Sequence, residues 1–179
     1  MNRKTTSIAA ALFVAGSALF AQTPAPPAPV TEVAALKAAY TGIKNNVTKA
    51  AERMPEDQYG FKASPDIRTF GALIGHIADT QARFCALAAG ATPPTTDAEK
   101  SKTAKADLVA ALKASFDVCD PVFASLTDED ASKMVSMGRG TRSKTAVLWQ
   151  LFIGHSNEEY GYLAVYMRIK GIVPPSTQP

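Results

Sequence analysis

The stretch TAVLWQLFIGHSNEEYGYLAVYMRIK, residues 145–170, decides the fold of this chain. At 100° per residue it presents one stripe, about 120° wide, formed by Leu148, Leu151, Phe152, His155, Glu159, Tyr162, Leu163 and Tyr166. His155 and Glu159 stand at i and i+4, so their side chains project from the same face one turn apart. An ionised carboxylate within an apolar surface is costly unless it is paired or binds a metal. The stretch therefore predicts a core-facing helix with a polar site in its middle.

Both ends of this helix are marked by residues typical of helix termini. Thr141 or Ser143 can act as the N-cap. Gly171 is placed for the left-handed residue that follows a helix, and Pro174-Pro175 prevents continuation. These signals make the register of the helix well defined.

Apolar residues at alternating steps of three and four predict three further long helices, over residues 31–54, 66–89 and 105–126. A short helix is expected from Thr127 toward Met134, because Thr127 is a favourable N-cap. Pro121 should kink or interrupt the helix over residues 105–126.

Polar sequence fills residues 91–105, which we interpret as a loop or a frayed helix start with a solvated face. Period-two alternation is absent, so no strand is predicted. The sequence therefore predicts an all-α fold, a four-helix bundle domain over residues 31–175 with a short extra helix before the last helix.

The N-terminal region has the pattern of an export signal. Arg3 and Lys4 precede a mostly apolar run that ends near Ala18 or Ala21, so residues 1–21 are predicted to be a signal peptide cleaved after Ala21, with cleavage after Ala18 as an alternative. The run is short for a membrane span, and a stable membrane anchor is not expected. Residues 22–30 form a Pro-rich linker. We expect an exported protein, periplasmic or secreted.

The charge balance argues against nucleic acid as a partner. The chain has 19 basic and 16 acidic residues, and loss of Arg3 and Lys4 would leave a net charge near +1. No basic patch interleaved with aromatic residues is present. A small-molecule substrate is the expected partner, and a homodimer of two bundles is a further alternative that no exposed apolar stripe in the sequence supports.

Two cysteines, Cys85 and Cys119, lie on two different predicted helices. Export would permit a disulfide between them, which is the favoured interpretation. The alternative is that both are small buried hydrophobic residues. A catalytic thiol is less favoured, because Cys85 is more than two turns from His76.

The chain contains only two histidines, and both lie on or beside the inner face of a helix. If the second and fourth long helices are neighbours, His76, His155 and Glu159 converge as a set of metal ligands. Two imidazoles and one carboxylate suit a divalent cation such as zinc, iron, nickel or manganese. Asp79 is a candidate outer partner or base, although a solvent-exposed ion pair is the favoured alternative for it, and Glu158 is a candidate substitute ligand.

The chain resembles the DinB/YfiT-like four-helix bundle superfamily. The resemblance spans about residues 31–175 and depends on short motifs at residues 54–61, 68–71, 75–79, 155–161, 166–168 and 171–175. It implies a metal-binding histidine at His76 and an H-x-x-x-H pair on the last helix, of which His155 is the first. Glu159 replaces the second, which favours harder ions or indicates a site that has lost its metal.

Two function classes follow. The resemblance implies a metal-dependent hydrolase or transferase, since members of the superfamily include thiol transferases and assigned hydrolases. Export would remove the protein from the cytoplasmic thiol pool and so disfavours thiol transfer. The alternative is a metal-free exported bundle that binds a small molecule or a partner, with His155 and Glu159 as a structural pair.

Overall fold

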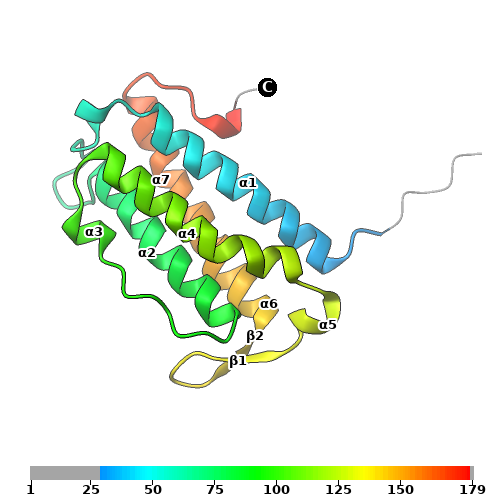
Figure 1. Cartoon of the computed structure of the whole chain (residues 1–179). Coiled ribbons are helices and arrows are strands. Elements are labelled where there is room, and N and C mark those ends of the chain that lie inside the picture. The colour runs from blue at the N-terminus through cyan, green and yellow to red at the C-terminus, as the bar shows by residue number, and fades with distance from the viewer. Residues whose placement is uncertain (1–28, 178–179) are drawn as a thin grey trace, which may run out of the picture.

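The computed structural model describes residues 29–177, and its long helices run side by side as one bundle (Figure 1). The predicted signal peptide and most of the predicted linker lie outside the described residues. The all-α bundle is confirmed. Its principal elements are α1 (Glu32–Arg53), α2 (Phe70–Ala88), α4 (Lys105–Ser125) and a composite last helix of α6 (Lys144–Ala146), η2 (Val147–Gly154) and α7 (His155–Ile169).

Shorter elements join these helices: η1 (Glu56–Gln58), α3 (Ala98–Ser101), α5 (Asp128–Ala131), β1 (Met134–Ser136), β2 (Thr141–Ser143) and η3 (Pro175–Thr177). Four helices begin after a hydroxyl side chain that accepts a hydrogen bond from the backbone N–H three residues later. These N-caps are Thr31, Thr69, Thr127 and Ser143. Thr69 therefore starts α2 at Phe70, and the predicted start at Asp66 is wrong.

Aromatic side chains from three helices form the centre of the core. Tyr40 of α1 stacks on Phe123 of α4 with ring centroids 4.0 Å apart, and Phe152 of the last helix packs edge-on against Phe123 at 5.2 Å. Both phenylalanines are buried. These contacts fix the last helix against α1 and α4, so that one of its faces turns toward α2.

The last helix departs from the predicted stripe in one respect. Tyr162 is 48% exposed, whereas the stripe placed it inward. Its middle part, η2, is a π-helix, whose i→i+5 winding changes the phase of residues before Gly154 relative to those after it. The buried face of α7 is consequently rotated away from Tyr162 toward Ser156 and Tyr160.

Two further sequence expectations are corrected. Strands β1 and β2 form a small antiparallel hairpin that pairs Met134 with Ser143, although no strand was predicted. Three-residue strands are too short to show alternation, and Gly138 and Gly140 supply the positive φ values that the turn needs. Helix α4 also continues through Pro121 to Ser125, which excludes the interruption that was one of the two expectations at this proline.

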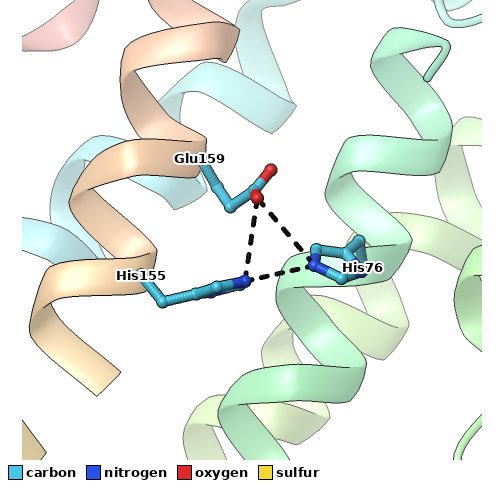
Figure 2. A group of neighbouring side chains, drawn as sticks. All are labelled: His76, His155 and Glu159. Carbon is cyan, nitrogen blue, oxygen red and sulfur yellow. Dashed lines mark hydrogen bonds and ion pairs between the residues drawn. The ribbon is translucent and has the colours of Figure 1, made fainter. Parts of the chain in front are cut away.

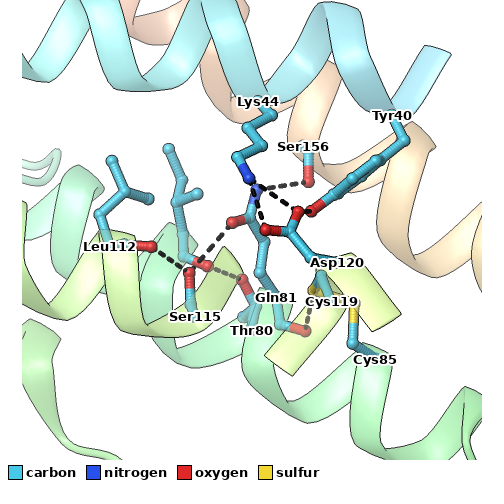
Figure 3. The surroundings of a disulfide bond; sticks show 11 residues. Tyr40, Lys44, Thr80, Gln81, Cys85, Leu112, Ser115, Cys119, Asp120 and Ser156 are labelled. Atoms are coloured by element: carbon cyan, nitrogen blue, oxygen red, sulfur yellow. Dashed lines mark hydrogen bonds and ion pairs between the residues drawn. A yellow bond between two sulfur atoms is a disulfide. The ribbon is translucent and has the colours of Figure 1, made fainter. Parts of the chain in front are cut away.

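Helices α2 and α4 are joined by a disulfide between Cys85 and Cys119, with Cα atoms 5.1 Å apart (Figure 3). This confirms the favoured pairing. Beside it, the buried side-chain amide of Gln81 donates a hydrogen bond through Nε2 to the Ser156 hydroxyl. The side-chain oxygen Oε1 of Gln81 accepts a hydrogen bond from the Ser115 hydroxyl. The disulfide and this polar network fix α2 against both α4 and α7.

None of the helices within residues 29–177 combines the length and hydropathy that a membrane crossing would require.

Candidate metal centre

The structure brings the three predicted side chains together from two helices (Figure 2). His76 comes from the middle of α2, His155 is the first residue of α7, and Glu159 follows one turn later. The two Nε2 atoms are 3.1 Å apart. Glu159 Oε1 lies 3.7 Å from Nε2 of His155 and 3.9 Å from Nε2 of His76. All three potential ligand atoms thus surround one point.

This spacing fits a shared ion. Nitrogen and oxygen ligands bind divalent transition metals at about 2.0–2.2 Å, which separates neighbouring ligand atoms by roughly 3–4 Å. Both Nε2 atoms and one carboxylate oxygen of Glu159 point toward the same region between α2 and α7 (Figure 2). The set leaves further coordination positions for a substrate, as catalytic sites do.

Glu159 shows the strongest sign of a missing partner. Its side chain is buried, with 5% of the residue exposed, and among the described residues Oε2 has no hydrogen-bond partner. The distances from Oε1 to both imidazoles are too long for hydrogen bonds. Burial raises the pKa of Glu159, against the opposing effect of His76 and Arg68. A cation among these three residues would satisfy the carboxylate.

His155 is held in the form that binds metals. Its ring is partly buried between α2 and the last helix and packs edge-on against Phe84. Burial, together with the neighbouring His76, lowers the pKa of His155 below its ordinary value of 6.5. The neutral imidazole is the form that donates a lone pair to a metal.

Sequence analysis missed a second carboxylate. Glu99 of α3 lies with Oε2 2.7 Å from Nδ1 of His76 and accepts a hydrogen bond from Nε of Arg68 at 2.7 Å. Burial alone would raise the pKa of Glu99, but the bonds to Arg68 and His76 outweigh it and lower the pKa. The interpretation of residues 91–105 as solvated hid this contact. A glycine inside a predicted helix, Gly75, could have indicated that another segment of backbone packs closely against α2 at this position.

The two secondary candidates lie outside the group of three. Asp79 accepts hydrogen bonds from the backbone N–H groups of Ala98 and Glu99, both at 3.0 Å, so it binds α3. Glu158 is exposed and accepts a hydrogen bond from the Tyr162 hydroxyl. Asp79 is therefore an outer partner of this region, and Glu158 points away from it.

An open groove of about 670 Å³ runs beside the centre and is lined by Asp66, Ile67, Arg68, Leu73, Tyr162 and Tyr166. Its floor is mostly aromatic and aliphatic. The Tyr166 hydroxyl donates a hydrogen bond to the backbone carbonyl oxygen of Arg68, and this bond holds the segment just before α2 against α7. Arg68 also contacts Glu99 and lies 3.4 Å from Nδ1 of His76, so the groove reaches the His76 side of the site, although none of the three candidate ligands lines it. Its volume suits a small molecule.

The fold and site define a class: helical bundles with two imidazoles and a carboxylate that could hold a metal between two helices. The chain belongs to the DinB superfamily, whose family model matches residues 39–163. A search of the curated proteins finds no match.

Solved structures of this fold are similar over most of the chain. A DinB-like protein, YjoA of Bacillus subtilis, is 22% identical with a TM-score of 0.61, covering 76% of this chain and 92% of its own. A DinB-like protein of Bacillus cereus is 16% identical with a TM-score of 0.67, covering 80% and 95%. YfiT of Bacillus subtilis, described as a probable metal-dependent hydrolase with an unusual four-helix bundle topology, is 13% identical with a TM-score of 0.56, covering 83% and 94%.

Proposed function

We propose that this protein binds one divalent cation through His76, His155 and Glu159 and acts as a metal-dependent hydrolase or transferase on a small molecule. The observation that carries the proposal is the buried Glu159 carboxylate, which accepts no hydrogen bond from any residue within 29–177 and faces two imidazole nitrogens. The description of YfiT as a probable metal-dependent hydrolase supports the same class of activity.

The donor set limits the ion and its role. Two imidazoles and one carboxylate suit zinc, iron, nickel or manganese, and the carboxylate favours harder ions than three imidazoles would. Such an ion would supply Lewis acidity toward an oxygen of the substrate. The groove residues Ile67, Leu73 and Tyr162 would bind the apolar part of the substrate beside it.

Export is part of the proposal. A disulfide persists in oxidising compartments, and the buried Cys85–Cys119 bond supports a periplasmic or secreted protein with its folded domain over residues 31–175. Expression of the full chain followed by N-terminal sequencing of the exported form would test it. A mature N-terminus at Gln22 is expected, whereas an intact Met1 on a cytoplasmic product would contradict export.

Metal content is the direct test. Protein purified without a metal-affinity tag should contain about one divalent ion per chain by elemental analysis, and a chelator should lower the melting temperature, because an ion that binds only the folded state stabilises it. Glu158→Gln is the matched control and should leave the metal content unchanged. If the purified protein contains no metal, and neither added Zn²⁺ nor a chelator changes its melting temperature, the alternative of a metal-free binding bundle is favoured.

The variant Glu159→Leu tests whether Glu159 is a metal ligand or a residue that stabilises the fold. In metal-free protein the substitution should raise the free energy of unfolding by about 1–3 kcal/mol, because it removes a buried carboxylate to which none of the described residues donates a hydrogen bond. Urea unfolding of both proteins in the presence of a chelator measures the difference. Destabilisation by the same substitution would indicate that Glu159 stabilises the fold as the partner of His155.

Metal affinity should fall with acidification, because protons and the ion compete for the same lone pairs. The lowered pKa of His155 keeps its ring available down to a pH below 6.5, while the raised pKa of Glu159 brings protonation of the carboxylate closer to neutrality. We expect the affinity for Zn²⁺ at about pH 5 to be at least roughly tenfold lower than at pH 7. Isothermal titration at several pH values measures it, and a pH-independent affinity would count against ligation by histidine.

A further inference from the structure

Helix α3 lies unusually close to α2 beside His76. A Cβ atom added to Gly75 would come within 2.6 Å of Glu99 Cα and 2.7 Å of Glu99 N. Such distances are not compatible with a side chain. Gly75, which immediately precedes His76, is therefore required for the backbone of Glu99 to approach α2.

A second residue of α2 fixes the same segment from the other side of His76. Both oxygens of the Asp79 carboxylate accept hydrogen bonds, one from the N–H of Ala98 and one from the N–H of Glu99, each at 3.0 Å. Gly75 and Asp79 stand at i−1 and i+3 relative to His76. Together they place Glu99 over the outer side of the His76 ring.

The Glu99 side chain then determines which nitrogen of His76 carries the proton. Its Oε2 lies 2.7 Å from Nδ1, and a lone pair on Nδ1 would repel it. Arg68 Nη2, which can only donate a hydrogen bond, also lies 3.4 Å from Nδ1 and would favour a lone pair there, but this contact is longer and weaker than the one to the Glu99 carboxylate. Nδ1 therefore carries the proton and donates it to Glu99, which leaves the lone pair on Nε2 facing His155 and Glu159.

We propose that Glu99 is a positioning residue that fixes the tautomer and orientation of His76, and that α3 is the device that holds it there. Histidine ligands commonly donate the other ring N–H to a carboxylate in this way. Arg68 offsets the charge of Glu99 through the 2.7 Å bond to Oε1, which counters the repulsion between the Glu99 and Glu159 carboxylates. The consequence for metal affinity rests on the proposed function, whereas the tautomer does not.

Nitrogen NMR of metal-free protein at about pH 8, above the ordinary imidazole pKa of about 6.5, tests the proposal. The chain has two histidines, so His155→Gln assigns the signals. Wild-type His76 should be protonated at Nδ1, and Glu99→Ala should abolish that preference. Gly75→Ala should do the same while Glu99 is still present, because the added Cβ displaces α3. Glu129→Gln in α5 is the control and should change nothing.

Asp79→Asn provides a milder displacement of α3 if Gly75→Ala fails to fold, and should weaken the Nδ1–H preference of His76 in part. A wild-type His76 protonated at Nε2, or a tautomer that Glu99→Ala leaves unchanged, would overturn the proposal. Glu99→Ala should also weaken Zn²⁺ binding by about 10–100-fold. A wild-type protein with the expected tautomer and no Zn²⁺ binding would refute the proposed function while supporting the positioning role.

Discussion

His155→Ala is expected to weaken the binding of Zn²⁺ by more than about 100-fold. Loss of an outer partner of a metal site typically costs 10–100-fold in affinity, and loss of a direct ligand should cost more. His155 supplies one of the three converging atoms, and only two imidazoles exist in the chain, so no other histidine can replace it. Titration against a competing chelating dye measures the change.

Unfolding does not provide an alternative explanation for that loss. His155 is partly buried, and alanine is favourable in a helix, so metal-free His155→Ala should melt close to the metal-free wild type. Glu158→Gln, three positions along the same helix, should retain wild-type affinity. Wild-type Zn²⁺ affinity in His155→Ala would place the metal elsewhere and refute the centre.

The second large effect concerns stability. Replacing Cys85 and Cys119 together by alanine is expected to lower the free energy of unfolding by about 4 kcal/mol, since the bond closes a loop with a sequence separation of 34 residues. Both sulfurs are fully buried, so alanine rather than serine avoids an unsatisfied hydroxyl. Urea unfolding of the oxidised protein and the double variant gives the difference.

Reduction of the wild type provides the matched control, because it breaks the bond without removing side-chain atoms. The reduced protein should lose a similar amount of stability, and the double variant should be insensitive to reductant. Equal stability of all three forms would mean that packing between α2 and α4 already constrains the chain, so that the disulfide contributes little.

The bundle was predicted from helix caps and apolar spacing, and the structure contains both. Thr127 and Ser143 cap helices as expected, and Gly171 takes the left-handed conformation after α7. The apolar spacing located each long helix to within a few residues. The hairpin was missed because strands of three residues carry no measurable period.

The candidate site was found because His155 and Glu159 interrupt an apolar face, an anomaly that is visible without coordinates. Glu99 carries no such anomaly. Its segment is polar and short, and its role depends on Gly75 and Asp79, which precede it by about 20 residues. The exposure of Tyr162 could not be predicted for a related reason, since the π-helix before Gly154 is visible only in the folded structure.

The sequence by itself determined the long helices, most of their inward faces and the two polar residues, His155 and Glu159, that interrupt an apolar stripe, because helix periodicity and the cost of burying charge act within one segment. Only the tertiary structure decided that α2 and α7 are neighbours, that Glu159 has no hydrogen-bond partner in the described part of the chain, and that α3 brings Glu99 to His76. Those facts depend on distances between segments far apart in the chain, which packing fixes and local sequence does not.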